Sequence, residues 1–292
     1  MNLREAYLRA SVETKEQFEA ACGRVDIVYI DSAFFDASAF ESMVNKAHMS
    51  NTLIGLRAPY IWRDKAENYF DGNPSAGKHN DTVIKLIKNA GFDAYLFRNA
   101  ESMLYFTEHG LTKDTDFATD SSMYVFNSEA AAELSAYIPD NIRKNHVSIT
   151  LPSELNGREL ESLSKTVRVK FQVNENAPGL ELVVYGRVPM MVSAQCINKT
   201  VHGCDKQEKL LMLKDRKDAE MPVKNCCRFC YNLIYNAVPT MLYDMPEVTE
   251  RIRPDAIRYD FTTESAGEVI DILNGIPLKA GCFTRGHLKR GV

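Results

Sequence analysis

Short runs of β-branched, aromatic and aliphatic residues alternate along this chain with stretches of helical periodicity. Such alternation is typical of parallel strands joined by crossover helices. The predicted strands span residues 7–12, 25–30, 52–57, 94–97, 123–126, 147–151, 182–185 and 256–261. The predicted helices span residues 14–23, 37–48, 81–90, 100–109, 128–136, 156–163 and 264–273. Eight such strands predict an α/β fold, a TIM-like (β/α)8 barrel, with an open doubly wound sheet as the alternative.

The segment at about residues 188–245 departs from this alternation and follows the seventh predicted strand. It holds five of the seven cysteines. We therefore predict a single barrel domain over residues 1–292, with a cysteine-rich insertion after strand 7. Because sites of such barrels gather at the carboxyl ends of the strands, the insertion would lie over that mouth.

The composition and the absence of certain motifs argue against several classes of function. The net charge of -4 argues against binding of nucleic acid through bulk positive charge, although a local basic patch is still compatible with it. No apolar run approaches the roughly 18 residues of a membrane span, and the start lacks a signal-peptide pattern, so we predict a cytoplasmic protein with no membrane partner. The GxGxxG, GxSxG and HExxH motifs are absent, so neither a dinucleotide fold nor a standard hydrolase has motif support.

Four cysteines of the segment have the spacing of a metal site: Cys196, Cys204, Cys227 and Cys230. Thiolates are the soft, charged ligands that an iron-sulfur cluster needs. Zinc is the alternative, but structural zinc sites usually show two close pairs, and only Cys227 and Cys230 are close here. The sequence leaves open whether Cys226 or Cys227 is the ligand.

Polar residues at the ends of predicted strands would face the barrel mouth. They are Asp31, Arg57, Arg98, Asn99, Asn127, Glu154, Arg187 and Asp260. Such residues could bind an anionic substrate, the alternative being that they are solvated strand ends. The basic tail at residues 284–292 could contact phosphate or RNA, or be a solvated terminus. The candidate substrate-binding residues are Arg57, Arg63, Glu154, Arg187 and His287, and no catalytic residue is assigned.

Several ordered motifs carry a family resemblance. They are Gly186–Met191, Gln195-Cys196, Asp215-Arg216, Cys227–Cys230, Thr284–His287 and Arg290–Val292. With these motifs the chain resembles the collagenase-like peptidase family U32. The resemblance implies a TIM-like barrel and a 4Fe-4S cluster on Cys196, Cys204, Cys227 and Cys230. Longer members carry a second, amino-terminal barrel, which implies such a barrel as a partner.

The resemblance implies two different functions, because some members are described as proteases acting on collagen and others as oxygen-independent hydroxylases of RNA or a quinone precursor. We expect iron-sulfur-dependent RNA modification, the hydroxylation of rRNA or tRNA, with RNA as the partner. One alternative is a collagenase-like peptidase of unknown catalytic type. Another is a non-catalytic module that an iron-sulfur cluster or zinc holds together.

Overall fold

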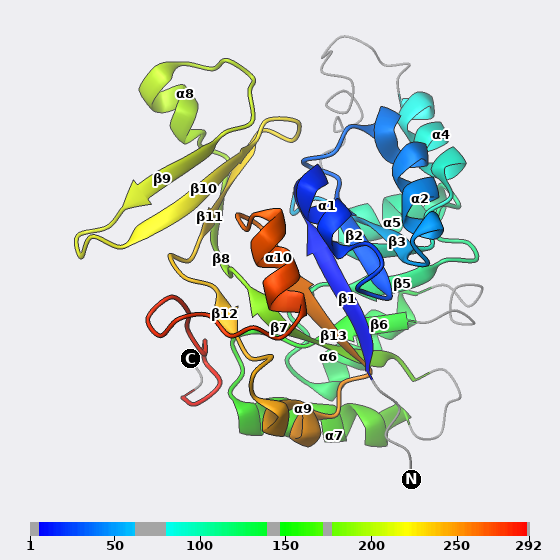
Figure 1. Ribbon diagram of the computed structural model, residues 1–292. Coiled ribbons are helices and arrows are strands. Elements are labelled where there is room, and N and C mark those ends of the chain that lie inside the picture. The colour runs from blue at the N-terminus through cyan, green and yellow to red at the C-terminus, as the bar shows by residue number, and fades with distance from the viewer. Residues whose placement is uncertain (1–5, 62–79, 139–146, 172–176, 291–292) are drawn as a thin grey trace.

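The computed structural model describes residues 6–61, 80–138, 147–171 and 177–290. Its centre is a closed barrel of eight parallel strands (Figure 1). These are β1 (Tyr7–Val12), β2 (Ile27–Asp31), β3 (Leu53–Arg57), β4 (Ala94–Phe97), β5 (Asp116–Thr119), β6 (Val147–Thr150), β7 (Gly179–Gly186) and β13 (Ala256–Asp260). The pairing of β6 with β7, and of β13 with both β7 and β1, closes the ring. The predicted TIM barrel is confirmed.

Helices surround the barrel and bury their apolar faces against it. They are α1 (Lys15–Ala21), α2 (Phe40–Met49), α4 (Asn80–Ala90), α5 (Ala100–Glu108), α6 (Ser128–Ala136), α7 (Gly157–Phe171), α9 (Pro246–Ile252) and α10 (Ala266–Leu273). Two 3-10 turns, η1 (Ala37–Ala39) and η2 (Ser121–Met123), precede α2 and α6. Helix α1 begins at a capping box in which Thr14 and Gln17 satisfy each other's backbone N–H groups. Among the described residues, no helix is long and apolar enough to cross a membrane.

The prediction for the fifth strand is wrong. The structure places β5 at Asp116–Thr119, whereas residues 123–126 lie in the connection to α6. Tyr124 has a left-handed backbone with φ 54°, which ends the 3-10 turn and cannot continue a strand. Its ring and that of Phe126 are exposed, so this aromatic run is not part of the core. The actual strand is short and buries Phe117 and Ala118.

The segment between β7 and β13 forms a second, antiparallel sheet beside the barrel (Figure 1). Its strands are β8 (Pro189–Ser193), β9 (Leu210–Lys214), β10 (Glu220–Cys226) and β11 (Tyr231–Tyr235), in the order β8-β11-β10-β9. Helix α8 (Ile197–His202) connects β8 to β9. The short strand β12 (Thr240–Met241) then pairs with β7, and α9 leads back into the barrel. We call the four strands and α8 the cysteine module.

Candidate active site at the carboxyl mouth of the barrel

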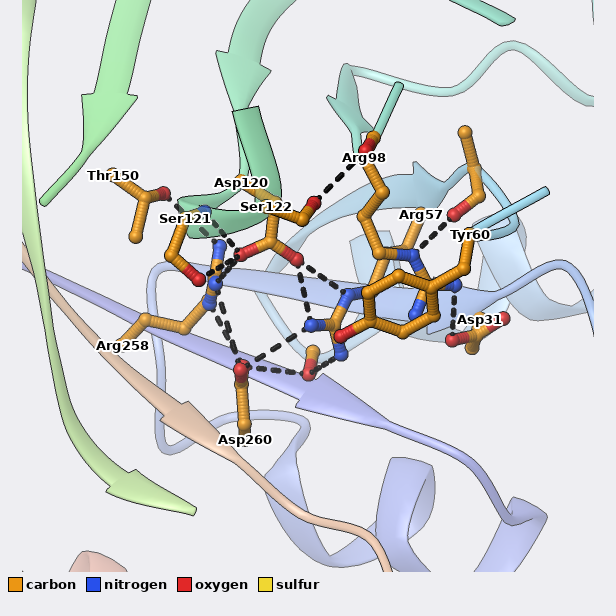
Figure 2. A network of polar contacts seen from close by, with 12 residues as sticks. Asp31, Arg57, Tyr60, Arg98, Asp120, Ser121, Ser122, Thr150, Arg258 and Asp260 are labelled. Carbon is orange, nitrogen blue, oxygen red and sulfur yellow. Dashed lines mark hydrogen bonds and ion pairs between the residues drawn. The ribbon is translucent and has the colours of Figure 1, made fainter. Parts of the chain in front are cut away.

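Alternation along the strands points charged side chains into the carboxyl half of the barrel (Figure 2). Asp120, directly after β5, lies between two arginines: its carboxylate is 2.7 Å from Arg57 Nη2 and 2.6 Å from Arg258 Nη2. Asp260 lies 2.8 Å from Arg258 Nε and 3.3 Å from Arg57 Nη2. The Ser11 hydroxyl donates to Asp260 at 2.8 Å and accepts from Arg57 Nη1 at 2.8 Å.

A deeper layer extends this network toward the centre of the barrel. Glu181 accepts hydrogen bonds from Arg258 at 2.6 Å, Arg9 at 2.9 Å and the Thr150 hydroxyl at 2.7 Å. All four residues are buried. Arg9 also donates to Ser148. The three arginines thus balance the three carboxylates of Glu181, Asp120 and Asp260, as buried charges require.

The network fixes the ionisation of Asp120. Burial opposes charge on Asp120, but Arg258 and Arg57 outweigh it and hold the pKa of Asp120 well below its usual range. Asp120 therefore stays ionised and serves to hold the arginines. Asp260 is the carboxylate nearest to solvent, with 15% of its side chain exposed against 2% for Asp120. Asp260 is thus the network group that a substrate in the mouth would meet.

A second buried pair lies beside the first. Arg98 Nη2 is 2.6 Å from Asp31, and Arg98 Nε donates to the Ala58 carbonyl at 2.5 Å. The guanidinium lies 4.1 Å from the centre of the Tyr60 ring. Burial raises the pKa of Tyr60 to about 12, so its phenol is protonated at neutral pH. Figure 2 shows the Tyr60 ring beside Arg57 and Arg98, where the phenol offers a hydrogen-bond donor.

The cysteine module is held against this mouth by strands β10 and β11. Lys224 pairs with Glu13, which directly follows β1, and donates to the Thr262 carbonyl at 2.5 Å. The hydroxyl of Tyr235 donates to Glu13 at 2.8 Å. Arg228, in the turn between β10 and β11, donates to the carbonyls of residues 32 and 35 after β2. One side of the module sheet therefore forms part of the wall of the mouth.

Two adjacent cysteines, Cys226 at the end of β10 and Cys227 in the turn that follows, have opposite environments. Cys226 is completely buried, and burial, followed by the charges of Asp31 and Glu13, raises the pKa of its thiol. Cys227 is half-buried and donates to the Gln207 carbonyl at 3.2 Å. Cys226 thus belongs to the wall of the mouth. Cys227 belongs to the open end of the module.

The open end also carries the other three cysteines of the predicted site. The thiol of Cys196 accepts from the Lys199 N–H at 3.4 Å and so caps α8. Cys204 follows α8 and is exposed, and Cys230 is exposed in the turn after β10. Burial, then the charge of Glu208, raises the pKa of Cys227 to about 11.

Four thiols at one end of a module are the donor set that a 4Fe-4S cluster or zinc requires. In the described part of the chain, however, no three His, Cys, Asp or Glu side chains already form a metal-binding group. The donors fit such a centre in chemistry and location, and binding would require the end of α8 and the β10–β11 turn to close around it. Both segments are short and lie at the surface of the module.

The other predicted binding residues are distributed around the barrel. Arg187 donates to Thr263 at 3.1 Å and to the carbonyls of residues 236 and 237, so it joins the loops after β7, β11 and β13. Glu154 lies half-buried in the loop between β6 and α7, and accepts from Ser153. His287 is exposed in the tail, where Leu288 accepts a hydrogen bond from the N–H of residue 157. Arg63 lies outside the described residues. Of the four candidates among the described residues, only Arg57 belongs to the network.

Sequence reasoning located half of the network and missed the rest. Asp31, Arg57, Arg98 and Asp260 were predicted to face the mouth, and they do. Asp120 was missed because the fifth strand was placed too late. Arg258 and Glu181 were missed although both carried a signal: each is a charged residue flanked by apolar residues within or beside a predicted strand. Arg258 is also two residues from Asp260, the spacing that puts both on one face.

No protein-family model matches the chain, and no curated protein matches it. A putative fructose-1,6-biphosphate aldolase from Coccidioides immitis is similar at 12% identity and TM-score 0.42, over 93% of this chain and 86% of that one. The spore cortex-lytic enzyme SleL of Bacillus cereus is similar at 8% and 0.42, over 97% and 77%. D-Psicose 3-epimerase from Clostridium cellulolyticum H10 is similar at 8% and 0.40, over 90% and 89%. Likeness at this level concerns the fold and says nothing about activity.

Proposed function

We propose that this protein is an iron-sulfur enzyme that acts at the carboxyl mouth of the barrel and modifies RNA by oxygen-independent hydroxylation. The resemblance of its sequence motifs to peptidase family U32 suggests the reaction. The observation that carries the proposal is the contact between the β10–β11 turn and the mouth. Arg228, which lies between Cys227 and Cys230 in this turn, donates to the carbonyls of residues 32 and 35 after β2. The cysteine end of the module is therefore next to the charged mouth.

The residues that would hold the cluster are Cys196, Cys204, Cys227 and Cys230. When bound, a 4Fe-4S cluster would supply electron transfer beside the mouth. Cys226 is excluded from this set by its enclosure in the wall, where Asp31 and Glu13 are its charged neighbours.

The residues of the barrel would bind and orient the substrate. Asp260 presents a carboxylate whose position is fixed by Ser11, Arg57 and Arg258, so it can accept a hydrogen bond without moving. The protonated phenol of Tyr60 can donate one from the other side. The β10 and β11 side chains that contact Glu13 and the loop after β2 limit the access of water to the mouth.

An aromatic pair in the loop after β5 supports a nucleotide substrate. Tyr124 and Phe126 are 62% and 40% exposed, and their rings are parallel within 5° with centres 6.2 Å apart. They follow Asp120 in the same loop, at the carboxyl end of the barrel. Exposed aromatic rings of this kind stack on unpaired bases, at about 1–3 kcal/mol per base. The loop thus offers a platform for an RNA base beside the mouth.

The first experiment tests the cluster. Protein purified without oxygen should contain about four irons and four acid-labile sulfides per chain, with a visible absorption band. The Cys227→Ala, Cys230→Ala double variant should lose both the metal and the band. The variant Cys282→Ala, which removes an exposed thiol outside the module, is the control and should keep them. Stoichiometric zinc, or no metal, would contradict the proposal.

The second experiment tests the reaction. Nucleosides of RNA from cells without the gene should lack one hydroxylated species by mass spectrometry. Wild type should restore it and Asp260→Asn should not, although its iron content is unchanged. Asp271→Asn, at an exposed position of α10, is the matched control and should restore it. Cleavage of a protein substrate that persists after cluster loss would instead indicate a peptidase.

A further inference from the structure

The outer strand of the cysteine module, β9, presents an unprotected edge (Figure 1). It pairs with β10 on one side, and no strand of the described residues pairs with the other. Exposed edges usually carry charges, proline or a bulge that blocks further pairing. The opposite edge follows this rule, because β8 begins with Pro189 and its ladder is irregular at Ile234/Tyr235. The first four residues of β9 are Leu, Leu, Met and Leu, so its edge carries no such protection.

The pairing with β10 shows which backbone groups of β9 point outward. The N–H of Asn225 donates to the carbonyl of Lys209, so residue 209 points toward β10. Because alternate residues point in opposite directions, Leu211 and Leu213 also bond to β10. Pro222, which has no N–H, lies opposite Met212. This is expected, because Met212 and Pro222 are a pair without hydrogen bonds in this pattern. The groups at the free edge are therefore those of Leu210, Met212 and Lys214.

We propose that β9 pairs with β9 of a second copy of this chain, antiparallel and around a two-fold axis at Met212. In this register Met212 lies opposite itself and Leu210 lies opposite Lys214. All three outward residues are then paired at once, with about six backbone hydrogen bonds. A shift of two residues leaves one of them unpaired. The result is a continuous eight-stranded sheet across the dimer.

Charges beside the strand agree with the same register. Lys209 comes opposite Asp215 of the second copy, and Glu208 comes opposite Arg216. Oppositely charged cross-strand pairs stabilise a sheet, whereas like charges oppose it. No shifted register brings all four residues opposite an opposite charge. The sequence around β9 is therefore complementary to itself in the register that the backbone favours.

Side chains of β9 gain burial on pairing. Leu210 and Met212 are each 52% exposed, on the same face of the strand. In the dimer Met212 contacts Met212, and the aliphatic part of Lys214 covers Leu210. Leu211 and Leu213 meet on the opposite face. This inference is independent of the proposed function, because it rests on the edge alone.

Light scattering after size exclusion, over a range of concentrations, tests the proposal. Wild type should be a dimer, and Met212→Pro should raise the dissociation constant about 100-fold, as expected for two lost hydrogen bonds at the axis. Proline is tolerated at this position because the Met212 N–H makes no bond to β10. Met190→Pro, on the edge strand β8, is the matched control and should leave the dimer intact. Circular dichroism checks the fold of both.

A second variant and a second measurement keep the test decisive. If Met212→Pro does not fold, Met212→Lys replaces it, because two lysines at the axis repel and weaken the dimer most at low salt. Amide exchange should show slow exchange at Leu210, Met212 and Lys214 in the wild-type dimer. A wild-type monomer at all concentrations would overturn the proposal. So would a dimer that persists in the Met212 variants, or one whose β9 edge amides exchange rapidly.

Discussion

The barrel interior and the open end of the cysteine module are both rich in reactive groups. The groups of the interior are paired with one another, whereas the thiols of the open end are not. In the interior each carboxylate lies within hydrogen-bond distance of an arginine, and the charges balance. At the open end four thiols are half-buried or exposed, and they do not form a metal-binding group among the described residues. The charges of the interior are balanced without a ligand. The open end has the composition of a site that a ligand completes.

The paired charges of the interior support a site, whereas the thiols of the open end could form one. Arg57 and Arg258 both donate hydrogen bonds to Asp120 and pair with Asp260, so their role is to hold these carboxylates in position. Arg57, which we expected from the sequence to bind an anionic substrate, is paired with Asp120 and Asp260 in the structure, and its substrate-binding role stays a prediction. Asp260 is the group at the boundary, since it belongs to the network and also reaches solvent.

The largest expected effect comes from removing the most central cation. Arg258→Met leaves Asp120, Glu181 and Asp260 with too few buried partners, and should lower the free energy of unfolding by about 3–5 kcal/mol. Chemical denaturation measures the change. Arg251→Met is the control, because Arg251 pairs with Glu161 at the surface and its loss should change little. Equal effects of the two variants would show that the interior network does not stabilise the fold.

The pH dependence of stability should follow Asp120. Its pKa is lower in the folded protein than in the unfolded chain, so its ionised form stabilises the fold above the unfolded pKa of about 3.9. This contribution is lost as the pH falls below that value. Asp120→Asn should be less stable than wild type at pH 7, by about 3 kcal/mol, and its stability should fall less steeply in acid. Unfolding curves from neutral pH to about pH 2 measure both slopes.

Comparing the two proteins cancels the opposite contribution of Glu13. Burial raises the pKa of Glu13, so this group alone would lower stability as the pH rises. Because both proteins contain Glu13, the difference between their curves reports Asp120. Parallel curves would contradict the role assigned to its carboxylate.

Cys226 at the end of β10 and Cys227 in the turn that follows allow a direct comparison of the wall of the mouth with the open end of the module. In metal-free protein, Cys226→Ser should lower the free energy of unfolding by about 1–3 kcal/mol, because it buries a hydroxyl in an enclosed position. Cys227→Ser should change it little, since that thiol is half-buried. Iron content should respond the other way, falling with Cys227→Ser and not with a folded Cys226→Ser. The reverse pattern would assign the ligand role to Cys226.

Local patterns were sufficient for the barrel but not for the cysteine module. Parallel strands that are buried on both faces have nearly continuous apolar sequences. Seven of the eight barrel strands were located from such sequences. The fifth was misplaced because Tyr124-Val125-Phe126 has strand-like composition, whereas Asp116–Thr119 contributes a single large side chain to the core. The module strands were not predicted, because their stability depends on pairing with one another more than on local propensity.

The site was predictable to the extent that it follows the strand ends. Arg98 and Asp31 were found in this way, as were Arg57 and Asp260. Arg258 and Glu181 lie within strands, where a charged residue interrupts an apolar run and was not predicted to face the mouth. Arg258 is two residues from Asp260, so alternation along the strand puts both on one face, a signal that the prediction did not use.

The smallest expected effect concerns one of the buried polar groups of the interior that have no hydrogen-bond partner in the described structure. The hydroxyl of Tyr29 is completely buried and has no hydrogen-bond partner in the described structure. Its ring lies against Gly55, where a Cβ would come within 2.3 Å of Tyr29 Cδ1. Tyr29→Phe removes the unpaired hydroxyl and keeps the ring, so the free energy of unfolding should be unchanged or rise by up to about 1 kcal/mol.

Tyr235→Phe is the matched control, because the Tyr235 hydroxyl donates to Glu13 at 2.8 Å and its removal should lower the free energy of unfolding by about 1–2 kcal/mol. Both changes are followed by chemical denaturation. A loss with Tyr29→Phe as large as that with Tyr235→Phe would mean that the Tyr29 hydroxyl is bonded in solution. The partner would then be a water or an ion between Tyr29 and the neighbouring Arg9 Nε, which is also unpaired in the described structure. In that case the interior, like the open end of the module, would need a ligand to be complete.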